Sequence, residues 1–359
     1  MEDVAVKFGI KEALNQRVVD HAVLDASQAY ATMHDIMDGT ATPAQIGAFL
    51  VALKIQEPTI EEISAFVKCM KDFAAIITPT TTDSVVDTCG TGGDVLKTIN
   101  ISTLSALVTA GAGVVVAKHG NRGVTSSCGS ADVLEQAGVN IMASPAVVER
   151  SINDCGIGFM FAPVFHPAMK NVVGPRKEVG LRTIFNVLGP LTNPANASGQ
   201  VLGVYDESIA DTMAKVLMEL GVQKFFIVHN DHGADEVLPA GNNIILERVG
   251  DAIESRVLVA EDFGIDPASV EDLQVGTSKD DIMHAFISIL KGTGPKALTD
   301  AVIMNSALAI VIGGKTTDLQ VAARLARDSL ETGAAIEKLK ALVIASGGNI
   351  EQYERFMEM

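Results

Sequence analysis

The sequence predicts an α/β fold in which a small all-helical domain accompanies a larger α/β domain with a mostly parallel central sheet. Three observations lead to this prediction. The first eighty residues show only helical patterns, whereas short β-branched runs alternate with helical patterns beyond Pro79. With 359 residues, of which 48% are apolar and 20% charged, the chain can also bury a sizeable core.

Helix-start signals define the N-terminal part. Asp25 or Ser27 is placed to cap a helix that ends at Gly39. The segment Thr42–Gln45 combines a capping box with proline at the first helical position, and Thr59–Glu62 repeats the capping box. We therefore expect three helices here, which form a packing or oligomerisation module.

The remainder of the chain alternates strands with helices, and this alternation is typical of a parallel sheet. Four short runs are expected to be strands: Val85–Asp87, Val114–Val116, Val201–Val204 and Phe225–Val228. The expected helices lie near Ser102–Ala112, Ser130–Ala137, Pro145–Asp154, Ser208–Leu220, Ala297–Ile312 and Asp318–Thr332.

The charge of the chain limits its partners. The formal net charge of −17 repels polyphosphate backbones, so neither nucleic acid nor an anionic membrane is expected as a partner. A phosphate site would have to attract its ligand locally, through backbone N–H groups, a few basic residues and a metal. Four cysteines without a Cys-x-x-Cys pair, and an opening segment Met1–Leu14 without an apolar core, predict a cytoplasmic protein with free thiols.

The strongest motif is Asp87–Asp94, with the sequence Asp-Thr-Cys-Gly-Thr-Gly-Gly-Asp. It follows a predicted strand and precedes a helix that begins near Asn100, so it should lie at the carboxyl edge of the sheet, where α/β proteins bind ligands. Its glycines let backbone N–H groups approach an anion, and the helix N-terminus favours negative charge. Ser102 and Thr103 offer hydroxyls to a phosphate or a metal. The motif predicts phosphate binding, although it matches neither the Walker loop nor the dinucleotide fingerprint.

A second loop, Lys118–Ser127, also leaves the end of a predicted strand and is followed by Gly129 and Ser130. Its two cations, its glycines and its hydroxyls suit a pyrophosphate, and Arg122 can bind one bidentately. A solvated basic loop would explain the cations but not the glycines and serines. His119 fits a hydrogen-bonding loop residue better than a general base.

Two further stretches leave alternatives open. The pair Asp235–Glu236 follows a predicted strand and suits one or two Mg²⁺ ions, but an acidic pair by itself is usually ordinary surface. The stretch Phe161–Met169, with Arg176 and Arg182 beyond it, combines aromatic side chains with arginines and suits a flat anionic aromatic acid. A helix-packing segment with surface arginines explains this second pattern equally well.

Together these motifs resemble the anthranilate phosphoribosyltransferase family. The family's G-T-G-G-D loop is followed by T-x-N-I-S-T, here Thr98–Thr103, and its second loop is K-H-G-N-R-x-V-x-S, here Lys118–Ser126. The stretches Gly129–Glu135, His166–Lys170 and Arg182–Pro194 also match. The likeness keeps a consistent order from about Leu24 to Thr332, and several independent motifs make it specific.

The resemblance implies a fold of the nucleoside phosphorylase/phosphoribosyltransferase type. Residues 1–79 and 166–192 would form the helical domain, and residues 80–165 and 193–359 the α/β domain that binds 5-phosphoribosyl 1-pyrophosphate. The implied reaction transfers the phosphoribosyl group to the amine of anthranilate, with release of pyrophosphate, in tryptophan biosynthesis. The resemblance also implies that two Mg²⁺ ions serve as cofactors and that the protein is a homodimer joined through the helical domain.

The resemblance assigns the site residues as well. Mg²⁺ would bind Ser102, Asp235 and Glu236, and anthranilate would face Gly90, Asn121 and Arg176. No general base is assigned, because an aromatic amine is neutral at pH 7 and can attack before it loses a proton. The implied ligands of phosphoribosyl pyrophosphate are Gly90, Gly93, Asp94, Thr98, Asn100, Ile101, Ser102, Thr103, Lys118, His119, Gly120, Asn121, Arg122, Gly123, Val124, Thr125, Ser126 and Ser130.

Some positions depart from the family's pattern. Val95 stands where glycine is usual, Ile99 where phenylalanine is frequent and Gly123 where serine is common, while Val237–Pro239 follows the acidic pair. These departures concern loop flexibility and affinity more than identity. Two rival functions are a pyrimidine nucleoside phosphorylase, whose glycine loop differs, and a non-catalytic nucleic-acid-binding relative, which the acidity and the intact second loop disfavour.

Overall fold

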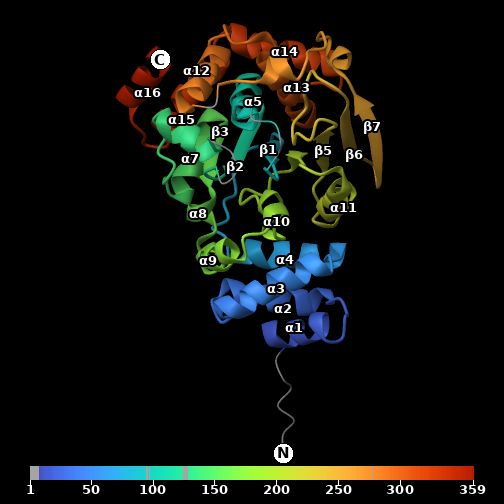
Figure 1. Ribbon diagram of the computed structural model, residues 1–359. Coiled ribbons are helices and arrows are strands. Elements are labelled where there is room, and N and C mark those ends of the chain that lie inside the picture. The colour runs from blue at the N-terminus through green and yellow to red at the C-terminus, as the bar shows by residue number, and fades with distance from the viewer. Residues whose placement is uncertain (1–7, 94–95, 97, 124–127, 277) are drawn as a thin grey trace, which may run out of the picture. The chain divides into compact units, whose positions relative to one another are not determined.

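The computed structural model describes residues 8–93, 96, 98–123, 128–276 and 278–359 (Figure 1). The chain forms two compact units. One unit consists of the chain up to Ile76 together with Phe165–Thr192, and the other of Ile77–Val164 together with Asn193–Met359. The first unit is helical and the second holds a seven-stranded sheet, which confirms the predicted fold class. Among the described helices, none is long and apolar enough to cross a membrane.

Local capping positions the helices of the helical unit. Asp25, rather than Ser27, caps its helix, and its side chain accepts from the Gln28 N–H at 2.9 Å. The predicted capping boxes at Thr42 and Thr59 are both confirmed. The helices of this unit are α1 (Ile10–Val18), α2 (Ala26–Met37), α3 (Pro43–Ile55), α4 (Ile60–Asp72), the 3₁₀ turn η1 (Pro167–Met169), α9 (Lys170–Val179) and α10 (Phe185–Leu191).

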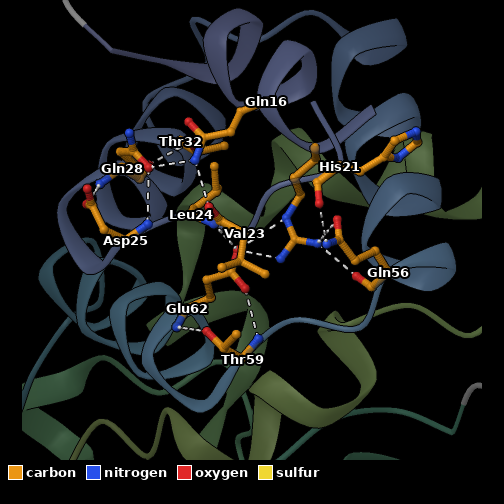
Figure 2. Close-up of polar contacts among 11 residues, drawn as sticks. Gln16, His21, Val23, Leu24, Asp25, Gln28, Thr32, Gln56, Thr59 and Glu62 are labelled. Atoms are coloured by element: carbon orange, nitrogen blue, oxygen red, sulfur yellow. Dashed lines mark hydrogen bonds and ion pairs between the residues drawn. The ribbon is translucent and has the colours of Figure 1, made fainter. Parts of the chain in front are cut away.

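Helix α1 was not predicted, and a buried ion pair explains why it is stable (Figure 2). Arg17 on α1 pairs with Glu62 on α4, and both side chains are fully buried. The Glu62 carboxylate also accepts from the N–H groups of Leu24 and Thr59, both at 2.8 Å, and Arg17 Nη1 donates to the Gln56 carbonyl at 2.8 Å. One carboxylate therefore fastens α1 and the turns before α2 and α4. Removing either partner would leave an unpaired buried charge, at a cost of roughly 3–5 kcal/mol.

The sheet has the strand order β3-β2-β1-β4-β5-β6-β7. The strands from β3 to β5 are parallel, whereas β6 and β7 form an antiparallel hairpin at one edge. The four predicted strands are confirmed as β1, β2, β4 and β5, and the structure adds the other three. The strands are β1 (Val85–Gly90), β2 (Val115–Gly120), β3 (Ile157–Phe161), β4 (Gly199–Gly203), β5 (Lys224–Asn230), β6 (Asn243–Val249) and β7 (Ala252–Leu258).

The core of the α/β unit lies where α5 and α13 pack against each other and against the sheet (Figure 1). Helix α13 is buried on nearly every side, as expected for a helix that is apolar all round. The helices are α5 (Ile101–Gly111), α6 (Ser130–Gln136), α7 (Pro145–Cys155), α8 (Ala162–Phe165), α11 (Ala210–Glu219), α12 (Lys279–Leu290), α13 (Lys296–Ile312), α14 (Leu319–Glu331), α15 (Ala334–Ala345) and α16 (Ile350–Glu358), with 3₁₀ turns η2 (Glu207–Ile209), η3 (Ala260–Phe263) and η4 (Glu271–Leu273).

Parallel pairing decides where the loops meet. Because β2, β1, β4 and β5 run in the same direction, the loops that follow them leave the sheet at the same edge. The glycine loop follows β1, the second loop follows β2, and the acidic pair lies beyond β5. This edge is where ligands bind in open α/β sheets.

Candidate active site

The glycine loop begins at the carboxyl end of β1 with a contact to the neighbouring strand. The Thr91 N–H donates to the Gly203 carbonyl at the end of β4, at 2.9 Å. Gly92 and Gly93 then have φ angles of +67° and +83°, a region that L side chains rarely adopt. Glycine is therefore required at both positions for the turn itself.

Helix α5 begins just beyond this loop. The Asn100 side chain caps the helix and accepts from the Thr103 N–H at 3.0 Å. Unpaired N–H groups and the dipole at such a helix start favour an anion. The Ser102 hydroxyl donates to Oδ1 of the Asn100 side chain at 3.4 Å. Ser102 thus stands in the first turn of α5, next to the loop.

One expected hydroxyl lies elsewhere. Thr103 is 1% exposed, and its hydroxyl has no hydrogen-bond partner among the described residues. It borders a small void lined by Leu107 and Leu134. Helical periodicity turns the Thr103 side chain toward the core, while its neighbour Ser102 is only half-buried, and a ligand role for the Thr103 hydroxyl stays a prediction.

The acidic pair contacts the glycine loop. Asp235 Oδ2 accepts from the Gly92 N–H at 2.8 Å. A Cβ added to Gly90 would lie 2.3 Å from Asp235 Oδ2, and one added to Gly203 would lie 1.6 Å from the Asp235 carbonyl oxygen. Such distances are far below van der Waals contact, so the ends of β1 and β4 must be glycine for Asp235 to lie here.

Lys118, at the carboxyl half of β2, is a buried cation beside these groups. It is 3% exposed, and its Nζ donates to the Thr88 carbonyl at 2.7 Å and to Ser102 Oγ at 3.3 Å. Burial lowers the pKa of Lys118, while the carboxylates of Asp87 and Glu236 act in the opposite direction. Lys118 therefore connects the first turn of α5 electrostatically with the acidic pair.

The side chain of Asp87 forms hydrogen bonds that connect the starts of both loops. Its carboxylate is fully buried and accepts from Asn193 Nδ2 at 2.8 Å and from the His119 N–H at 3.2 Å. Burial raises the pKa of Asp87, an effect that Lys118 and Asn193 partly offset. Asn193 also donates to the Ala117 carbonyl at 2.9 Å. Sequence analysis did not identify this function of Asp87, because its partner lies more than a hundred residues away in the chain.

The second loop is attached to helix α6. Arg122 donates to both carboxylate oxygens of Glu135, at 2.7 and 2.9 Å, and to Asp132 Oδ1 at 3.0 Å. Asp132 Oδ2 accepts from the N–H groups of Gly123 and Gly129, both at 2.9 Å. The sequence suggested a cation available for pyrophosphate, whereas the structure pairs Arg122 with two carboxylates.

Arg176 lies on α9 in the helical unit, whereas Gly90 and Asn121 belong to the α/β unit. Its guanidinium donates to Asn186 Oδ1 at 3.4 Å and lies 5.7 Å from the centre of the Phe185 ring. Burial lowers the pKa of Arg176. The arginine is thus half-buried and held against an aromatic ring, unlike a solvated surface arginine.

The remaining predicted ligands differ in exposure. Ile101 and His119 are buried, Gly93, Thr98, Gly120 and Ser130 are half-buried, and Asn121 and Gly123 are exposed. The predicted ligands Asp94, Val124, Thr125 and Ser126 lie outside the described residues, as does Val95.

The two units and this site define a class of protein. Residues 12–74 match the helical bundle domain of a glycosyl transferase family, and residues 82–336 match the a/b domain of the same family. The chain is 44% identical to anthranilate phosphoribosyltransferase from Thermoanaerobacter sp. over 93% of its length and 98% of the relative. It is 46% identical to the Moorella thermoacetica enzyme over 91% and 96%. The chain therefore belongs to the anthranilate phosphoribosyltransferase family.

Solved structures agree with this assignment. The crystal structure of anthranilate phosphoribosyltransferase from Thermus thermophilus superimposes with a TM-score of 0.87 at 38% identity, over 93% of this chain and 99% of that chain. The enzyme from Saccharomyces cerevisiae has the same fold, with a TM-score of 0.86 at 23% identity over 94% and 98%.

Proposed function

We propose that this chain transfers the phosphoribosyl group of 5-phosphoribosyl 1-pyrophosphate to the amine of anthranilate and releases pyrophosphate, as a step of tryptophan biosynthesis. Its family membership supports this reaction. The observation that carries the proposal is the meeting of the glycine loop, the acidic pair and the start of α5. The Gly92 N–H bond to Asp235 and the Lys118 bond to Ser102 link these elements.

The two loops would hold phosphoribosyl pyrophosphate. Backbone N–H groups at the start of α5 are suited to phosphate oxygens, and glycines in the loop let a ligand approach the backbone closely. Lys118 adds a charge that little solvent screens, because it is buried. The proposed ligands are the residues that the resemblance assigns between Gly90 and Ser130, apart from Arg122, whose guanidinium is paired with Asp132 and Glu135.

Ser102, Asp235 and Glu236 would hold Mg²⁺. All three supply hard oxygen atoms, the donors that Mg²⁺ prefers; Asp235 contacts the glycine loop, and Ser102 contacts the buried Lys118. When bound, Mg²⁺ would neutralise charge on the departing pyrophosphate. The Saccharomyces cerevisiae enzyme has been solved in complex with phosphoribosyl pyrophosphate and Mg, which supports this proposal, and we propose two ions.

The chemistry requires positioning more than proton transfer. Breaking the bond between ribose C1 and the pyrophosphate oxygen leaves an oxocarbenium-like centre and a growing negative charge. N–H groups and Lys118 would stabilise that charge. The neutral amine attacks C1 and then loses its proton to solvent, so the reaction needs no strong general base.

Gly90, Asn121 and Arg176 would orient anthranilate. A guanidinium is suited to the carboxylate of this substrate, and the packing of Arg176 on Phe185 limits the freedom of its side chain. The Saccharomyces cerevisiae enzyme has been solved in complex with 4-fluoroanthranilate, which supports an acceptor site of this type.

We also propose a homodimer joined through the helical unit. Val18, Val19 and Ile55 are 53%, 66% and 82% exposed. Helix α1 packs on α3, and Arg17 donates to the Gln56 carbonyl, so the helix ends that carry these exposed apolar residues are neighbours. Contiguous apolar surface of this kind marks interfaces.

The proposal is tested by a fluorescence assay for phosphoribosyl-anthranilate with and without Mg²⁺. Asp235→Asn with Glu236→Gln should remove most activity and most of the Mg²⁺ dependence, because amides keep the volume but lose the charge. Asp251→Asn with Glu254→Gln removes the same charge from the β6–β7 hairpin and should leave activity unchanged. No product from the wild-type chain would refute the proposal. Cleavage of a pyrimidine nucleoside by phosphate would identify a phosphorylase instead.

A further inference from the structure

A single carboxylate oxygen, Oδ2 of Asp132, binds both Gly123 and Gly129 in the second loop. Gly123 and Gly129 approach so closely that a Cβ on Gly129 would lie 2.1 Å from the Gly123 nitrogen. Both N–H groups donate to Asp132 Oδ2 at 2.9 Å. Asp132 is the third residue of α6, and capping that helix requires only the bond from Gly129. The bond from Gly123 therefore joins the incoming arm of the loop to the outgoing one.

A second contact fixes the same arm. The guanidinium of Arg122 donates two hydrogen bonds to the Glu135 carboxylate and a third to Asp132 Oδ1, the oxygen that does not bind the glycines. Its other side faces the ring of Phe161 at the end of β3, 5.7 Å from the ring centre. Hydrogen bonds from Arg122 lower the pKa of Glu135. Arg122, Asp132 and Glu135 form what we call the clasp.

The charge of the clasp is unusual for a pyrophosphate site. Two carboxylates lie beside the loop, and they repel an anionic ligand unless they are neutralised. Arg122 is paired with both of them, and the N–H groups of Gly123 and Gly129 also bind Asp132. Burial alone would raise the pKa of Asp132, but these hydrogen bonds outweigh it and lower the pKa. Asp132 is therefore bonded to the loop backbone and Glu135 to the Arg122 side chain, and these contacts favour the ionised form of both carboxylates.

We propose that Asp132 and Glu135 are positioning residues for phosphoribosyl pyrophosphate, and that Arg122 acts as the strut of the clasp rather than as a direct ligand. Their task is to set the distance between Gly123 and Gly129, and so the positions of the neighbouring predicted ligands Asn121 and Ser130. The proposal rests on the proposed function, since it names residues that shape the same site. It assigns a function to the Gly129–Glu135 stretch that helix capping alone does not explain.

The first experiment measures the Kd of phosphoribosyl pyrophosphate by calorimetry for Asp132→Asn and Asp132→Ala in the full chain. The asparagine keeps one uncharged acceptor, whereas alanine keeps none. Kd should rise about tenfold for Asn, which loses the charge of the acceptor, and about a hundredfold or more for Ala, which loses both hydrogen bonds. Asp318→Asn, at the N-cap of α14, removes a comparable helix-start carboxylate and should leave Kd unchanged.

Steady-state kinetics separates positioning from general destabilisation. Loss of the clasp should raise KM for phosphoribosyl pyrophosphate while kcat and KM for anthranilate change less than about threefold. A variant that merely folds poorly would lose kcat for want of active protein, with both KM values unchanged. That pattern, or a Kd within twofold of wild type for folded Asp132→Ala, would overturn the proposal.

A double-mutant cycle decides the role of Arg122. Arg122→Ala and Glu135→Ala should each raise Kd, and the double variant should bind about as weakly as Arg122→Ala alone, because both changes remove the same ion pair. A much larger rise in Kd for Arg122→Ala than for Glu135→Ala, with additive effects in the double variant, would show that the guanidinium itself is the ligand and would overturn its assignment as a strut.

Failure of the clasp and failure of the proposed function give different results. A wild-type chain that binds phosphoribosyl pyrophosphate but forms no phosphoribosyl-anthranilate refutes the function, and the Kd series then decides the clasp. A wild-type chain that does not bind phosphoribosyl pyrophosphate overturns both.

Discussion

Replacing Gly203 by alanine should misplace the acidic pair without removing any functional group. Gly203 ends β4, and the added Cβ would lie 1.6 Å from the Asp235 carbonyl oxygen and 3.0 Å from its Cβ. Backbone cannot yield as a flexible side chain does. The loop that carries Asp235 must therefore move away from the end of the sheet, and its bond to the Gly92 N–H should be lost with it.

The size of the effect follows from that distance. Ordinary contact begins near 3.4 Å, so the Asp235 carbonyl must shift by about 1.8 Å. A misplacement of about 1 Å in a catalytic site can cost about a hundredfold in rate, equivalent to about 2.7 kcal/mol. We expect kcat/KM to fall at least a hundredfold, and the Mg²⁺ concentration for half-maximal rate to rise. Overpacking should also lower the free energy of unfolding by about 1–3 kcal/mol.

The assay is phosphoribosyl-anthranilate formation across a Mg²⁺ titration, with circular dichroism to confirm the fold. Gly221→Ala is the matched control, because its φ of +80° makes alanine strained while nothing lies within 4 Å of the added Cβ. It should lower the free energy of unfolding by roughly 1–2 kcal/mol and leave the Mg²⁺ midpoint unchanged. If Gly203→Ala kept kcat/KM within threefold and the same midpoint, the acidic pair would not be the metal site.

Two further predictions concern the helical unit. Arg176→Ala should lower kcat/KM for anthranilate about ten- to a hundredfold through loss of a charge-assisted contact of about 1.5–3 kcal/mol, and should leave KM for phosphoribosyl pyrophosphate nearly unchanged. Lys177→Ala on the same helix is the control, and equal losses toward both substrates would argue against an acceptor contact. Ile55→Lys should convert the proposed dimer to a monomer in analytical ultracentrifugation, whereas Ile344→Lys, 62% exposed on α15, should not. A dimer that persists in Ile55→Lys would exclude this surface as the interface.

The helices and the first strands could be predicted because their determinants are local. The capping boxes at Thr42 and Thr59 each need only four residues. The β-branched runs of β1 and β5 are recognisable because parallel strands are buried on both faces. The hairpin β6–β7 was missed, since it is half-exposed and its pattern depends on which face the sheet covers.

The features of the candidate site can likewise be separated into those with local determinants and those that depend on distant residues. Sequence alone identified the glycine loop, the second loop and the acidic pair, because glycines, hydroxyls and carboxylates at the ends of strands already specify anion and metal chemistry. It did not reveal that Gly203 has to be glycine, since the reason is Asp235, a residue on another strand connection. Nor did it reveal that Asp87 is held by Asn193, or that Arg122 is paired with Glu135.

Local sequence patterns specify the helices and strands and the chemistry that each loop offers. Which groups meet was decided only by the tertiary structure. Pairing between residues far apart in the chain depends on strand order and register, and these follow from the packing of the whole core rather than from any local pattern. Glu62 illustrates both parts: its place in a capping box is local, whereas its buried pairing with Arg17 exists only because α1 folds against α4.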